Sequence, residues 1–96
     1  MPPRSLLSQR VHARFREVFG EPDNSLGRDD HWSLKTGPGK SAINLLVNGT
    51  LEVPAIWVFD PHSQGDDEVM RVAVKDEAHV DDIIRKIQER VKRAAS

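Results

Sequence analysis

The chain contains one run that largely decides its fold, VPAIWVFD at positions 53–60. The run is almost wholly apolar, rich in β-branched and aromatic side chains, and closed by Asp60-Pro61. This composition is typical of a strand buried on both faces. Strand alternation divides its side chains into one set with Val53, Ala55, Trp57 and Phe59, and another with Ile56 and Val58. We therefore expect packed structure over both faces of this strand.

Three further segments alternate as strands do, at residues 31–35, 42–47 and 68–74. Asn48-Gly49 predicts a hairpin between the second of these and the run at 53–60, because both residues tolerate positive φ. Pro54 lacks an N–H, so we expect the pairing to begin at Ala55. The polar, turn-rich residues 21–30 and 61–67 are predicted loops.

A helix is predicted at each end of the chain. At residues 5–19, Leu7, Val11 and Phe15 share one stripe, and Gly20 stands where a helix-ending residue with positive φ belongs. The second helix begins after Asp76, a good N-cap, and its charges oppose the helix dipole at both ends. Its apolar stripe consists of Val80, Ile83, Ile84, Ile87 and Val91.

The predicted order α-β-β-β-β-α indicates an α+β fold, an antiparallel meander of three to four strands with an N-terminal and a C-terminal helix. We expect one small domain over residues 1–96, with 1–4 disordered and 94–96 frayed. Two helices can cover both faces of the sheet only if one lies on each side. Otherwise the second face meets a partner, so self-association is also predicted.

The composition excludes several classes of function. The 96 residues include no cysteine, which excludes disulfides, thiolate chemistry and cysteine-based zinc sites. A net charge of -1 supplies no overall field to attract nucleic acid. The longest apolar run is too short to cross a membrane, and residues 1–7 are too polar for a signal peptide. We expect a cytoplasmic protein without a membrane partner.

One string resembles a nucleotide-binding motif, TGPGKS at residues 36–41. Its Gly-Lys-Ser ending matches the phosphate loop, but Leu34 stands where the first glycine belongs. The residues that follow predict a strand, whereas a phosphate loop opens a helix. We interpret the string as a β-turn between two strands, with a loose anion-binding turn as the alternative.

The histidines and acidic residues show no catalytic or metal-binding spacing. The acidic loops around His31 and His62 are interpreted as solvated loops, and His12 and His79 as surface residues of the two helices. We therefore predict no catalytic residue, no metal ligand and no cofactor. An enzyme that uses His31 or His62 with neighbouring carboxylates is retained as a third hypothesis.

Basic residues on the two helices raise the alternative of nucleic-acid binding. If the helices pack side by side, their cations could merge into a strip that follows a phosphate backbone. The candidate contacts are Arg10, Arg14, Lys40, Lys86, Arg90 and Arg93. Solvated helix faces, partly paired with acids, are the favoured interpretation.

The two tryptophans are both interpreted as core residues. Trp32 begins a strand beside His31, so a role as a partner contact is its alternative. Taken together, these observations favour a non-catalytic protein-interaction or accessory module, acting on a protein partner or as a homodimer. A small nucleic-acid-binding protein is the alternative.

Overall fold

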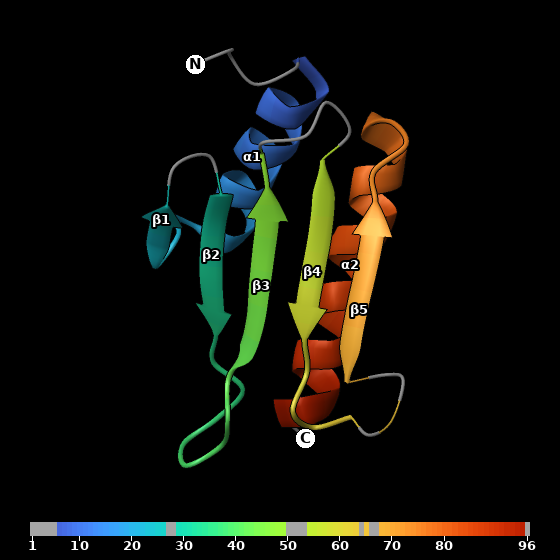
Figure 1. Ribbon diagram of the computed structural model, residues 1–96. Helices are drawn as coiled ribbons and strands as arrows, with labels where there is room; N and C mark the ends of the chain where they lie inside the picture. The colour runs from blue at the N-terminus through green and yellow to red at the C-terminus, as the bar shows by residue number, and fades with distance from the viewer. Residues whose placement is uncertain (1–5, 27–28, 50–53, 64, 66–67, 96) are drawn as a thin grey trace.

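The described residues of the chain form two α-helices and one sheet of five antiparallel strands that lie side by side in chain order (Figure 1). The computed structural model describes residues 6–26, 29–49, 54–63, 65 and 68–95. The elements are α1 (Leu6–Phe19), β1 (Asn24–Leu26), β2 (Asp29–Leu34), β3 (Ile43–Asn48), β4 (Ala55–Phe59), β5 (Val69–Ala73) and α2 (Glu77–Ala95). The predicted α+β class and antiparallel meander with terminal helices are confirmed.

The sheet has one strand more than the sequence predicted, namely β1. Its three residues lie in the segment predicted as a loop, and Ser25 pairs with Asp30 of β2. A strand of three turn-forming residues carries too little alternation to be recognised. It forms because β2 offers a free edge for backbone hydrogen bonds, which is information that only the assembled sheet contains.

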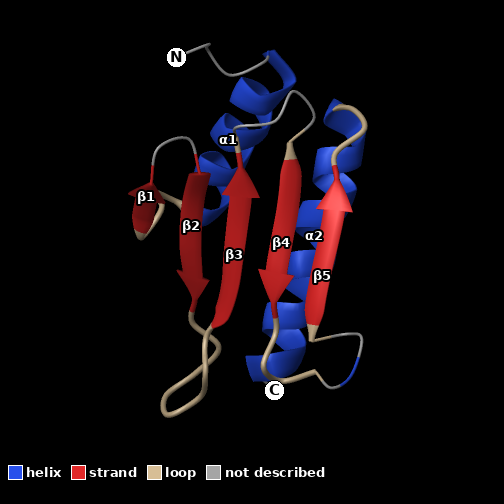
Figure 2. Cartoon of the chain, in the orientation of Figure 1, coloured by secondary structure: helices blue, strands red, loops and turns tan. Residues whose placement is uncertain are grey.

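Both helices pack on the same face of the sheet (Figure 2). Apart from Asp30, the helix-facing side chains of β2 to β5 are apolar, whereas His31, Ser33, Asn44 and Arg71 point to the other side. Only one face can therefore bury the apolar stripes of two helices. The arrangement with one helix on each face is wrong, and the expected burial of the run at 53–60 on both sides is not met within one chain.

The core lies between this face and the helices. The largest buried side chain is Trp32, and Phe15 of α1 packs against it with 6.0 Å between ring centroids. The other core residues are Val11, Ile43, Leu45, Val47, Ile56, Val58, Val74, Val80, Ile83, Ile84 and Ile87. Most of the predicted stripe residues are among them, and Leu7 and Val91 are partly buried against the core, so the helical periodicity is confirmed.

Local signals for the helix ends are also confirmed. Gly20 has φ of 83°, and its N–H donates to the Arg16 carbonyl at 2.9 Å, which ends α1. Asp76 Oδ1 accepts a hydrogen bond from the His79 N–H at 2.9 Å, which caps the start of α2. The second helix continues to Ala95 and so includes residues that were expected to fray.

The central hairpin joins β3 and β4, with Asn48 opposite Ala55. Pairing thus begins at Ala55, as Pro54 predicted, and the Pro54 carbonyl accepts from the Val74 N–H at 3.0 Å. The hairpin that Asn48-Gly49 predicted is therefore confirmed, with Asn48 as the last residue of β3. Residues 50–53, including Glu52 and Val53, lie outside the described residues.

Candidate interaction surface

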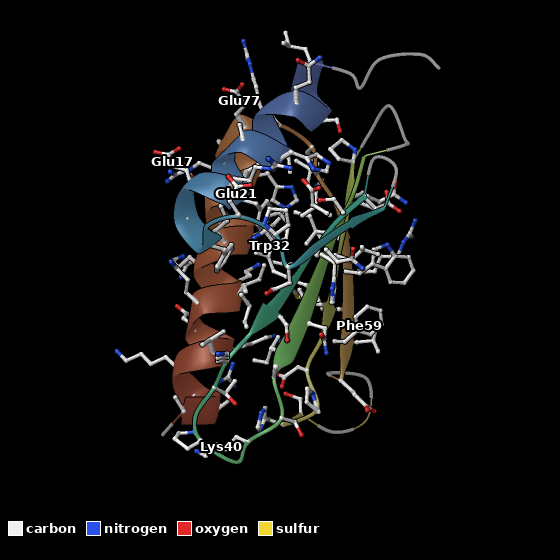
Figure 3. All side chains as sticks on the ribbon, turned by 90° about the vertical axis from the view of Figure 1, so that its left-hand side faces the viewer. Glu17, Glu21, Trp32, Lys40, Phe59 and Glu77 are labelled. Atoms are coloured by element: carbon white, nitrogen blue, oxygen red, sulfur yellow. The ribbon has the colours of Figure 1, made fainter. Side chains whose placement is uncertain are left out.

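The sheet face opposite the helices is covered by no described element, and we call it the open face. It consists of the outward side chains of β2 to β5: Asp29, His31, Ser33, Asn44, Leu46, Asn48, Ala55, Trp57, Phe59, Val69, Arg71 and Ala73. Figure 3 shows Phe59 directed away from the helices, whereas Trp32 lies between the helices and the sheet. Of the three large apolar side chains that are exposed among the described residues, two, Phe59 and Val69, lie on the open face.

An aromatic pair occupies the middle of the open face. Trp57 and Phe59 stand two residues apart on β4, with 6.4 Å between their ring centroids and 8° between their planes. Phe59 is 40% exposed, and its cross-strand neighbour Val69 is 44% exposed. The guanidinium carbon of Arg71 lies 5.1 Å from the centroid of the Trp57 ring, a cation–π contact. These four side chains form a contiguous, mainly apolar surface over β4 and β5.

Polar groups frame this apolar centre on the side of β2 and β3. His31 Nε2 lies 3.2 Å from Asn44 Oδ1, so the two side chains are hydrogen-bonded across the strands. At the start of β2, Asp29 Oδ1 accepts from the Gly49 N–H at 3.1 Å. An apolar centre with a polar rim is the usual composition of a protein–protein contact surface.

The structure confirms that Trp32 is a core residue and contradicts the same interpretation of Trp57. Trp32, a candidate partner contact, is 1% exposed, and its Nε1–H donates to the Gly20 carbonyl at 3.0 Å. Trp57, expected in the core, is half-buried on the open face. The alternation within each strand was correct, but it does not specify which face the helices cover. The polar residues His31, Ser33 and Asn44 lie on the same face of the sheet as Trp57, and they were the sequence signal that this face is not the buried one.

A second correction concerns His12, which is buried and not a surface residue. Its Nδ1–H donates to Asp30 Oδ2 at 2.6 Å, and Ser25 Oγ donates to Asp30 Oδ1 at 2.8 Å. Arg16 Nη2 lies 3.5 Å from Asp30 Oδ2. Asp30 stands in phase with Trp32 on β2, so a carboxylate on the core side required a partner. The position of Asp30 in phase with Trp32 was the signal in the sequence that could have revealed this cluster.

The surroundings of Asp30 set its ionisation. Burial alone would raise the pKa of this carboxyl group, but the hydrogen bonds from His12 and Ser25 and the charge of Arg16 lower the pKa below 3.8. The group is therefore a carboxylate at neutral pH. It ties α1, β1 and β2 together, which makes the cluster a structural link between elements.

A similar buried carboxylate, Asp60, directly follows the last residue of β4. It accepts hydrogen bonds from the His62 N–H at 3.0 Å, the Ser63 hydroxyl at 2.9 Å and Arg90 Nη1 at 3.0 Å. Burial opposes ionisation here too, but these donors and the charge of Arg90 lower the pKa of Asp60 below 3.8. The loop after β4 is thereby attached to α2.

The predicted nucleic-acid contacts on α1 face acidic residues of α2. Arg10 pairs with Glu77, and Arg14 Nε lies 3.0 Å from Asp81 Oδ1. Within α2, Lys86 Nζ lies 3.2 Å from Asp82 Oδ2. The two helices do lie side by side, but carboxylates are interleaved with their cations.

The remaining candidate cations gather at the other end of α2. Arg90 pairs with Asp60, and Lys40 Nζ donates to the Ala94 carbonyl at 2.9 Å. Arg90 and Arg93 line a cavity of about 180 Å³ together with Asp60. Thirteen helical residues, roughly 20 Å, separate the positions of Glu77 and Arg90. Arg10 and Arg14 therefore lie near the start of α2, Lys86 lies in its middle, and Lys40, Arg90 and Arg93 lie near its end.

The Thr36–Ser41 string is a turn between β2 and β3, as interpreted from the sequence. The Lys40 N–H donates to the Gly37 carbonyl at 3.1 Å, and Thr36 Oγ1 donates to the Ser41 carbonyl at 2.9 Å. His62 Nε2 lies 2.7 Å from the same carbonyl oxygen. His62 therefore contacts this turn, and His31 contacts Asn44.

We also examined the described residues for metal-binding groups and compared the chain with known proteins. In the part of the chain that the structure describes, no group of three or more His, Asp or Glu residues is placed to hold a metal ion. None of its described helices has the length and apolarity required to cross a bilayer. Comparisons with protein-family models, curated proteins and solved structures gave no match.

Proposed function

We propose that the protein is a non-catalytic interaction module that associates with a second copy of itself through the open face. The observation that carries this proposal is the exposed apolar surface of Trp57, Phe59 and Val69, which no described element covers. Burying such apolar surface against a partner would stabilise the complex by roughly 25 cal/mol of free energy per Å². A contiguous apolar surface of this kind is typical of an interaction site.

The charges of the open face favour a second copy as the partner. Arg71 lies on β5 and Asp29, the carboxylate of this face, lies on β2. A two-fold axis near the strand direction would place each β2 over β5 of the second copy. Arg71 would then lie over His31 of the other copy, two residues along β2 from Asp29, while Leu46 would meet Trp57 in the middle.

The size of the open face sets the expected strength of the contact. Four strands of about five residues span roughly 17 Å by 15 Å, which is about 250 Å² in projection. A stable interface buries roughly 800 Å² on each partner. We therefore expect a weak dimer with a dissociation constant of about 100 µM, which corresponds to a binding free energy of roughly −5.5 kcal/mol.

Sedimentation velocity between about 10 µM and 1 mM tests the proposal, since this range brackets the expected dissociation constant. The average mass of the wild type should rise towards that of a dimer. A Phe59→Gln, Val69→Gln variant should stay monomeric, because both side chains are exposed on the open face. Leu6→Gln is the matched control, since Leu6 is 62% exposed on α1, away from the open face. A wild type that stays monomeric at the highest concentration would contradict self-association.

The nucleic-acid alternative remains a prediction. Arg10, Arg14, Lys86 and Arg90 each have a carboxylate partner. A phosphate backbone would have to displace these carboxylates before it could contact the cations. The ion pairs therefore give this alternative no additional support.

A further inference from the structure

A groove on the helix side of the sheet has a composition unlike that of the open face. It has a volume of about 440 Å³ and lies between the end of α1, the end of β2 and the last turns of α2. Phe19, Leu34 and Val91 supply its apolar lining, and all three are only partly buried. A volume of this order is typical of small-molecule sites.

The groove exists because α1 is short. The helix ends at Phe19, where Gly20 turns the chain, whereas α2 continues to Ala95 (Figure 1). The end of β2, at Leu34, therefore lies beyond the reach of α1. Apolar groups of three elements are left facing a space that neither helix fills.

The charges at the groove have a single sign. Among its described lining residues the ionisable ones are Lys35 and Lys92, both exposed. The C-terminal end of α2 contributes roughly half a negative charge, which two ammonium groups outweigh. Lysine side chains extend their charged ends into water while their stems cover apolar surface. The groove is thus apolar at its base and positive at its rim.

We propose that this groove binds an aliphatic carboxylate. The hydrocarbon chain would lie on Phe19, Leu34 and Val91, and the carboxylate would face Lys35 and Lys92. The apolar base excludes a small, fully hydrated anion as the preferred ligand, and the positive rim disfavours a cationic amphiphile. Of its described lining residues, this site shares only Ser33 with the open face, so it does not depend on the proposed self-association.

An amide NMR titration of the full chain with decanoate, below the concentration at which decanoate forms micelles, tests this inference. Shifts should cluster at Phe19, Leu34, Lys35 and Val91. Decanol and decyltrimethylammonium carry the same chain with a neutral or a cationic head, and each should bind at least about fivefold more weakly. Acetate should cause no shifts there.

Lysine variants separate the role of the rim from that of the apolar base. Lys35→Gln, Lys92→Gln should weaken decanoate binding about tenfold, because each lost charge accounts for roughly a two- to fivefold effect. Lys75→Gln, an exposed lysine that does not line the groove, should leave binding unchanged. Equal binding of decanoate and decanol, shifts confined to the open face around Trp57, or an unaltered affinity of the double variant would each overturn the inference. Binding to phosphatidylglycerol vesicles without binding to decanoate would also overturn it, in favour of a membrane surface.

Discussion

At the scale of single residues, the pair of His12 and Asp30 ties α1 to the sheet through a buried hydrogen bond. Hydrogen bonds to charged groups contribute roughly 1.5–3 kcal/mol when buried. We expect Asp30→Asn, which keeps the volume of the side chain, to lower the free energy of unfolding by about 2 kcal/mol. Urea denaturation followed by tryptophan fluorescence measures this change.

Asp81→Asn is the matched control for that substitution. Asp81 pairs with Arg14 in an exposed position, where solvent screens the two charges, so Asp81→Asn should lower the free energy of unfolding much less than Asp30→Asn. If both variants lose the same stability, the cluster around Asp30 is not the link between elements that its burial indicates.

The two buried carboxylates also predict the response to acid. Asp30 and Asp60 both have a pKa below 3.8 in the folded chain. The unfolded chain therefore binds protons more readily than the folded one as the pH falls through this range. Their contribution to stability is fully present above the unfolded pKa and is lost as the pH falls through the folded pKa.

We therefore expect the free energy of unfolding to fall below about pH 4. In Asp60→Asn this fall should be shallower, since one of the two groups no longer titrates. Urea denaturation from pH 2 to pH 7 provides the comparison. A variant with the same slope as the wild type would show that Asp60 does not contribute to the acid response.

At the scale of an element, β4 has two faces with different physical roles. Ile56 is fully buried against the helices, whereas Val69, beside the other face of β4, is 44% exposed. Ile56→Ala should lower the free energy of unfolding by about 3 kcal/mol, because it leaves a cavity in the core. Val69→Ala should change it by less than about 1 kcal/mol and should weaken the self-association. Chemical denaturation of both variants at low protein concentration separates the two effects.

Glycine is required at the end of α1 because of the backbone conformation of Gly20, and not because a larger side chain would clash there. Gly20 has φ of 83°, and a Cβ added there would meet no atom within 4 Å. Gly20→Ala should therefore lower the free energy of unfolding by about 1 kcal/mol through its unfavourable φ alone. Gly20→Asn should lower it less, since Asn tolerates this region better. Thermal unfolding of the two variants gives the ranking, and a larger loss in Gly20→Asn would contradict the conformational explanation.

At the scale of the whole molecule, the proposed dimer depends on charges at opposite sides of the open face. Arg71→Glu should weaken the dimer about fivefold, because the introduced carboxylate would approach Asp29 of the second copy. The Arg71→Glu, Asp29→Arg double variant should restore part of the affinity, as an exchanged pair. Sedimentation at low and moderate salt measures both. A double variant weaker than Arg71→Glu would indicate a different orientation of the two copies.

Much of the fold follows from local patterns in the chain. The helical stripe around Val11 and Phe15, the cap at Asp76 and the alternation of Trp32 with Leu34 all act within a few residues, so the helices, the succession of elements along the chain and the α+β class could be predicted. β1 could not, because its pairing partners lie outside its own three residues.

The candidate surface is the part that local patterns could not locate. The sequence by itself determined that Trp57 and Phe59 share one face of β4, because side chains alternate along any strand. Only the tertiary structure decided that both helices pack on the opposite face, which leaves this pair exposed and buries Trp32 and His12. The physical reason is that alternation sorts side chains into two sets, whereas the choice of the set to bury is made by the whole sheet and both helices together.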